Sequence, residues 1–78
     1  MRVTHDSEAD AAYVYLVEHI SRGEVAHSHA ADIALENAAL TVDFDANGCV
    51  VGIEVLGASR VLRPETIQAA ENITRPAR

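Results

Sequence analysis

The stretch "TVDFDANGCVVGIE" (residues 41–54) admits two folds. Its acidic residues, glycine and final glutamate match the pattern of an EF-hand calcium loop, in which alternating oxygen ligands surround the ion. The same letters also describe two β-strands joined at Asn47–Gly48, a dipeptide that strongly favours tight hairpin turns. The residues on either side of the turn decide between the two interpretations.

The flanking residues favour the hairpin. "LTVDF" and "GIEVL" alternate apolar and polar residues with the period of a strand, whereas an EF-hand needs a helix on each side of its loop. With a two-residue loop at Asn47–Gly48, all the large apolar residues share one face, through the pairs Phe44–Val51, Val42–Ile53 and Leu40–Val55. A three-residue loop would shift the pairing by one residue and mix the faces, so burial favours the two-residue loop.

The calcium interpretation fails on distance. In the hairpin, Glu54 lies about 20 Å along the strand from the turn, too far to close a cage around an ion. Asp43, Asp45 and Glu54 instead project from the side opposite the apolar residues, where we expect a solvated face, a contact surface for a basic partner protein or a weak divalent-ion site. Gly52 lies on the same side, and a strand glycine indicates a close approach. We expect the C-terminal helix or a second subunit to make that approach.

The remaining chain predicts one α+β domain over residues 1–78, with a core spanning 2–73 and a frayed tail at 74–78. Pro64 and Glu65 are typical of a first helical turn, and Ile67, Ala70 and Ile73 would then share one helical face. Residues 11–18 are apolar on both faces, which indicates a strand inside the sheet. The predicted fold is an antiparallel meander of about five strands (2–6, 11–18, 25–33, 39–45 and 49–56) with one C-terminal α-helix packed on it.

The length, charge and cysteine content limit the functional classes to which this protein can belong. The 78 residues carry a net charge of −6, and the six Arg are scattered rather than clustered, which disfavours nucleic-acid binding. No apolar run has membrane-spanning length and no signal sequence is evident, so we expect a cytoplasmic protein. The single Cys49 excludes an internal disulfide. Because so short a chain buries only about 60% of its unfolded surface, we expect a homodimer or higher oligomer.

Few residues are of types that could bind a metal ion or take part in catalysis. His27 and His29 would share a strand face and could hold a metal together, although no third ligand is indicated; exposed histidines or a pH-sensitive subunit contact are the alternatives. We expect Cys49 to be a small buried residue. Tyr13 and Tyr15 fit core aromatics with their hydroxyls at the rim. Within the turn at residues 6–10, backbone capping accounts for the carboxylates of Asp6, Glu8 and Asp10.

These features predict a non-catalytic protein–protein interaction module without a cofactor, since so short a chain leaves little room for a catalytic pocket. The alternative is a small-ligand or divalent-metal binder that uses His27 and His29 at a subunit interface.

Two segments, "HDSEADAAYVYL" (5–16) and "VDFDANGCVVGIEVLGAS" (42–59), together resemble the YuzE-like family of small bacterial proteins, known as domain of unknown function 2283. The matching positions are Asp6, Glu8, Ala9, Asp10, Tyr13 and Leu16, then Asp43, Asp45, Gly48, Gly52, Ile53 and Glu54, followed by Ala58 and Ser59. The chain departs from the family at His5, where tyrosine is usual, and in the Ala-rich connection 30–39. The resemblance implies a small α+β fold without established catalytic residues. Some members look as if they lie beside small basic toxin-like proteins, which implies an antitoxin or partner role.

Overall fold

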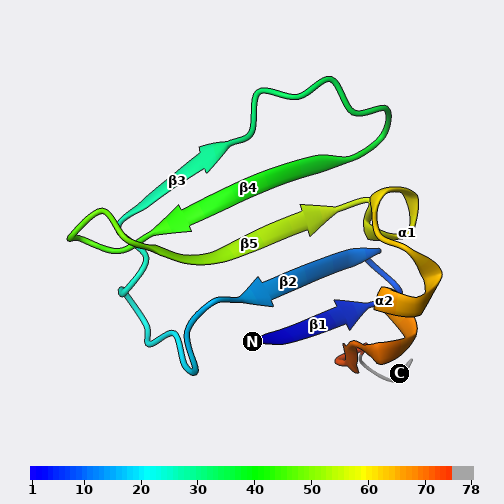
Figure 1. The fold of residues 1–78 in the computed structure, drawn as a ribbon, viewed down its shortest axis with the longest axis horizontal. Helices are drawn as coiled ribbons and strands as arrows, with labels where there is room; N and C mark the ends of the chain where they lie inside the picture. Colours follow the sequence, from blue (N-terminus) through cyan, green and yellow to red (C-terminus); the bar gives the residue numbers. More distant parts are fainter. Residues whose placement is uncertain (75–78) are drawn as a thin grey trace.

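The structure is a computed structural model that describes residues 1–74, and it shows an α+β fold (Figure 1). Its described part contains six strands and two short helices. In chain order they are β1 (Arg2–Asp6), β2 (Ala11–Tyr15), β3 (His27–Ala30), β4 (Ala39–Phe44), β5 (Val50–Leu56), α1 (Ala58–Val61), α2 (Pro64–Ala69) and β6 (Glu71–Asn72).

All six strands form one mixed sheet in the order β3-β4-β5-β2-β1-β6. Neighbouring strands are antiparallel except β1 and β6, which are parallel. The predicted five-stranded antiparallel meander is therefore wrong in strand number and order. The long apolar strand β5 takes a central place between β4 and β2, so the connection after β2 must carry the chain past both strands to the β3 edge. The prediction that β2 lies inside the sheet is confirmed.

The β4–β5 hairpin is confirmed, but its turn differs from the expected one. Asp45 and Cys49 close a three-residue loop, with the Asp45 amide donating to the Cys49 carbonyl at 2.9 Å. Gly48 has a φ of +80°, whereas Asn47 does not have the positive φ that a type I′ turn would require. The Asp45 side chain stabilises this loop, because its Oδ1 accepts hydrogen bonds from the amides of Asn47 and Cys49, each at 2.9 Å.

A β-bulge restores the predicted register beyond this longer loop. Phe44 pairs with Val50, yet Asp43 pairs with Gly52, so Val51 is an extra residue on β5. From there the register is the expected one, with Val42 opposite Ile53 and Leu40 opposite Val55. The bulge thus reconciles a three-residue loop with separate polar and apolar faces. Because of it, Phe44 faces Val50 and not Val51.

The C-terminal region forms two short helices and a strand instead of one helix. Arg63 is extended, as expected before a proline, and this separates α1 from α2. Ala70 is also extended and ends α2, after which β6 pairs with β1. Ile73 lies beyond β6, with its amide bonded to the His5 carbonyl, so its predicted place on the helical face is wrong. Of the predicted frayed tail, Thr74 hydrogen-bonds to Ser7, and residues 75–78 lie outside the described part.

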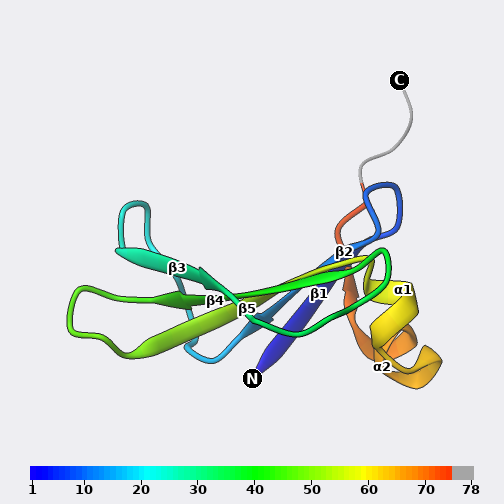
Figure 2. The same ribbon diagram turned by 90° about the horizontal axis from the view of Figure 1, so that it is seen from above.

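The core lies between the helices and one end of one sheet face (Figure 2). Ala12, Val55 and Ala58 are buried there. Partly buried apolar side chains from the sheet and both helices surround them: Leu40, Ile53, Val61, Leu62 and Ile67. Because α1 and α2 have only four and six residues, they cover only part of this face.

Asp10 fixes the helices to the sheet. Its carbonyl accepts the Ala58 amide at 2.9 Å, and its carboxylate accepts the Ser59 hydroxyl at 2.6 Å and the Ser59 amide at 3.0 Å. The same carboxylate contacts His5 Nε2 at 3.2 Å. These contacts, the Ser59 hydroxyl first, lower the pKa of Asp10 below its ordinary value. Asp6 caps the amides of Glu8 and Ala9, so the capping expected within this turn is confirmed for Asp6, whereas the Asp10 carboxylate bonds to Ser59 outside the turn.

Gly52 leaves room for the aromatic ring of Tyr13. A Cβ at Gly52 would overlap the Tyr13 ring and hydroxyl. The expected close approach is therefore present, but a side chain of the neighbouring strand β2 makes it, and neither the helix nor a second subunit is needed. Tyr13 pairs directly with Glu54 across the strands, so its ring leans diagonally over Gly52.

We expect Gly52→Ala to destabilise the fold by about 1–3 kcal/mol, because the added methyl group must displace the Tyr13 ring. In a Tyr13→Ala background the same change should be nearly neutral, since the space is then empty. Urea unfolding midpoints of the four proteins in this double-mutant cycle measure the coupling. Equal costs of Gly52→Ala in both backgrounds would contradict the contact.

Candidate functional site

The polar side of the hairpin is organised around the Asp43 carboxylate. The Tyr13 hydroxyl donates to Asp43 Oδ2 at 2.7 Å, and the Ser28 hydroxyl donates to Oδ1 at 2.6 Å. Tyr13 belongs to β2, Asp43 to β4 and Ser28 to β3, and the Tyr13 ring passes over Gly52 of β5. One carboxylate therefore connects side chains from strands that span most of the sheet.

Burial, followed by the hydrogen bond to Asp43 and the negative charge of Asp43, raises the pKa of Tyr13 above its ordinary value of 10.0. The phenol is thus held as a neutral donor. A raised folded-state pKa stabilises the fold while the phenol is protonated in both states, below about pH 10, and this contribution is lost as the pH rises further.

The three predicted acidic residues have different surroundings. Asp43 is half-buried and holds two hydroxyl donors, and Asp45 Oδ1 holds two amides of the turn. Glu54 is exposed, and its side chain makes no hydrogen bond or salt bridge within residues 1–74. Asp43 and Asp45 therefore serve the fold, whereas Glu54 is an open carboxylate on the same side.

His27 and His29 lie on one face of the edge strand β3, as their spacing predicts, and both are exposed. The His29 ring packs edge-on against Phe44 with 5.6 Å between centroids. Residues 1–74 contain no group of three metal-ligating side chains, so metal binding by this pair stays a prediction. Cys49 is exposed beside the turn, and its expected burial is wrong because the three-residue loop places it next to Asp45 at the hairpin tip.

The sheet face that carries the helices continues as an apolar surface beyond them. We call this surface the open apolar face; it consists of Val3, Val14, Leu16, Val42, Phe44 and Val50. Leu16 and Val50 are the most exposed of the six, at 39% and 38%. The sequence analysis missed this surface, because it predicted one longer C-terminal helix where the structure has helices of four and six residues.

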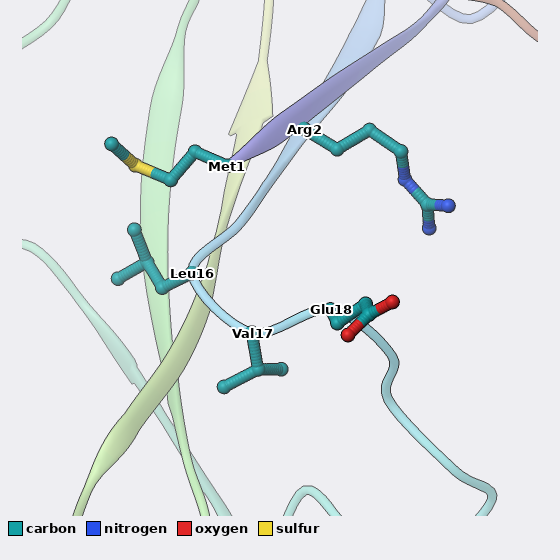
Figure 3. Close-up of a pocket in the computed structure, with 5 residues that line it drawn as sticks. All are labelled: Met1, Arg2, Leu16, Val17 and Glu18. Carbon is teal, nitrogen blue, oxygen red and sulfur yellow. The ribbon is translucent and has the colours of Figure 1, made fainter.

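Two shallow recesses adjoin the open apolar face. One, of about 450 Å³, is lined by Met1, Arg2, Leu16, Val17 and Glu18. Figure 3 shows the Met1 and Leu16 side chains pointing to one side of the chain and Arg2 to the other. The second recess, of about 410 Å³, lies between Met1, Val3 and residues of α2. Met1 is 98% exposed and borders both recesses.

The described helices do not have the length and apolar character that would let one cross a membrane.

In a Tyr15→Phe variant, where Tyr13 is the remaining phenol, we expect an ultraviolet titration midpoint above pH 10. Adding Asp43→Asn should lower this midpoint, because the negative charge that disfavours phenolate is removed. Asp45→Asn is the matched control and should leave it unchanged, since Asp45 bonds to the turn and not to Tyr13. A midpoint at or below 10 in the folded protein would contradict the buried hydrogen bond.

Among known proteins, one family model matches the part of the chain that forms the β4–β5 hairpin and the β1–β2 turn. No curated protein and no solved structure matches the chain. The model of the family described as "Protein of unknown function (DUF2283)" matches residues 2–59, which include β1 to β5 and the Asp10–Ser59 contact. Since this match covers well over half of the residues, the chain belongs to the DUF2283 family.

Proposed function

We propose that this protein is a non-catalytic protein–protein interaction module with two contact surfaces on opposite faces of its sheet. The observation that carries the proposal is the open apolar face, which the two short helices leave uncovered. The opposite face bears the hairpin carboxylates. One sheet thus offers an apolar surface and an acidic surface that suit different partners.

The acidic surface would bind a basic partner protein. Glu54 is open to solvent, and Asp45 keeps its second carboxylate oxygen outside the turn hydrogen bonds. Asp43 adds negative charge behind them, and the net charge of −6 favours encounter with a basic protein. Such a partner accords with the antitoxin-like role that the family resemblance implies.

The arrangement of the polar residues supports a role without catalysis. Ser59, Asp10 and His5 are in contact, but Asp10 lies between the hydroxyl and the imidazole. In a catalytic triad the histidine occupies the middle position, because it must accept the serine proton. The Asp10 group instead has the geometry of a structural clamp.

A second candidate function is binding of a divalent metal or small ligand by His27 and His29 at a subunit interface. The observation that favours it is the placement of both imidazoles on one face of the exposed edge strand β3. Two histidines make an incomplete site, so a neighbouring subunit would supply the remaining ligands.

We expect a tagged form of the protein to retain a small basic protein from extracts of its native host. Glu54→Gln should weaken this retention roughly fivefold, because it removes the open carboxylate. Raising the salt from about 0.05 to about 0.5 M should also weaken it, because the Debye length shortens. Quantitative mass spectrometry of the retained proteins measures both effects.

Glu65→Gln, on the exposed surface of α2, removes the same charge elsewhere and should leave retention unchanged. Retention that is insensitive to both Glu54→Gln and salt, or the absence of any retained basic protein, would exclude the acidic surface as the contact.

A further inference from the structure

We infer that the open apolar face is the interface of a homodimer, with a second copy of this chain as its occupant. The inference rests on the proposed function and names the partner of its apolar surface. The amount of exposed surface, the distribution of charge and the positions of the helices support it.

The chain exposes more surface than a free domain of its mass. Its accessible surface is 5775 Å², whereas a folded monomer of 8.4 kDa exposes about 4,600 Å². Residues 75–78 cannot account for the difference. If they contributed the whole of the roughly 700 Å² that an unfolded segment of their mass exposes, residues 1–74 would still exceed the roughly 4,400 Å² expected for a folded monomer of their own mass by about 650 Å².

This excess has the size of one side of a protein–protein interface. Each partner in a stable complex typically contributes about 800 Å². Part of the exposed apolar surface lies on the open apolar face, where Leu16 and Val50 are 39% and 38% exposed, and part lies outside it, at Ile33, Leu56 and Ile73.

The distribution of charge selects a second copy over a basic partner for this face. All carboxylates on strand positions lie on the opposite face of the sheet: Asp6, Asp43, Glu54 and Glu71. The charged residues that line the recesses at the rim of the open apolar face are Arg2, Glu18 and Glu65. The polar strand residues on this side of the sheet are His5, His27, His29 and Asn72. Two copies of an acidic chain can therefore meet here without opposing their strand carboxylates, whereas a basic partner would find few acids.

The helices fix the relative direction of the two copies. A two-fold dimer uses the same patch on both subunits. Because α1 and α2 stand at one end of the face (Figure 2), a dimer with parallel strand directions would bring the two helix pairs into collision. With opposite strand directions, the helix pairs lie at opposite ends and flank the contact between the sheets.

Sedimentation equilibrium of the full chain tests the inference, and we expect twice the monomer mass of 8.4 kDa at micromolar concentration. Val50→Glu should raise the dimer dissociation constant at least about 100-fold, because it would bury an unpaired carboxylate. Leu56→Glu is the matched control: Leu56 lies on the same strand and is 44% exposed, but it faces the other side of the sheet. It should leave the dimer intact.

Leu16→Glu provides a second variant if Val50→Glu does not fold, because Leu16 follows β2 directly and belongs to the open apolar face. Amide chemical shifts of the unmodified protein, followed on dilution, provide a measurement without any substitution; they should change at Val3, Val14 and Val42. A monomer at all concentrations, or a dimer unaffected by both substitutions and by dilution at these residues, would overturn the inference.

Binding of an apolar fluorescent dye separates this inference from the proposed function. A monomer whose dye binding is lost on Val50→Glu and kept on Leu56→Glu would retain the apolar contact surface but exclude the second copy. A monomer that binds no dye would overturn both.

Discussion

The hydrogen bond from Tyr13 to Asp43 across Gly52 is the contact on which the rest of the sheet depends. It joins β2 to β4 over the intervening strand, and Ser28 extends it to the β3 edge. Such a bond needs a glycine in the middle strand, because any side chain there would occupy the place of the ring. Burial of the Tyr13 phenol, followed by this hydrogen bond and the charge of Asp43, raises the pKa of Tyr13. The same contact lies on the polar face of the sheet, opposite the large apolar side chains of β4 and β5.

That division of faces connects the fold to the proposed function. On the polar face, the Asp43 carboxylate accepts hydrogen bonds from two hydroxyls and the Asp45 carboxylate accepts them from two amides. Of the three hairpin acids, Glu54 alone makes no such bond in the described part of the chain. The apolar face is buried only where α1 and α2 cover it. The ten helical residues within residues 1–74 cannot cover a six-stranded sheet, so uncovered apolar surface remains at one end of the sheet face. Both proposed contacts follow from this asymmetry.

The sequence predicted the features that depend on local alternation. The hairpin register from Leu40 to Asp43, the interior position of β2 and the capping role of Asp6 follow from local patterns, and the structure confirms them. The tip of the hairpin differs because the Asp45 side chain stabilises a longer loop, and a bulge at Val51 compensates for the extra residue. The alternation pattern alone treats the two-residue and three-residue loops as exclusive. The structure has the three-residue loop and, beyond the bulge, the register expected for the two-residue loop.

Other features depend on contacts between residues distant in sequence. Ile73 fits a helical period, but its amide pairs with the His5 carbonyl, and this long-range pairing replaces a last helical turn. The choice of Tyr13 as the group over Gly52 required knowledge that β2 neighbours β5, which follows from the crossover and not from either segment alone. The open apolar face became evident only when the shortness of the two helices was known.

The position of the Tyr13 ring over Gly52 is tested most directly by proton NMR of the unmodified protein. We expect strong nuclear Overhauser effects between the Tyr13 ring protons and the Gly52 α-protons, and an upfield shift of those α-protons from the ring current. Gly52 α-protons at random-coil positions, without any Overhauser contact to Tyr13, would contradict it.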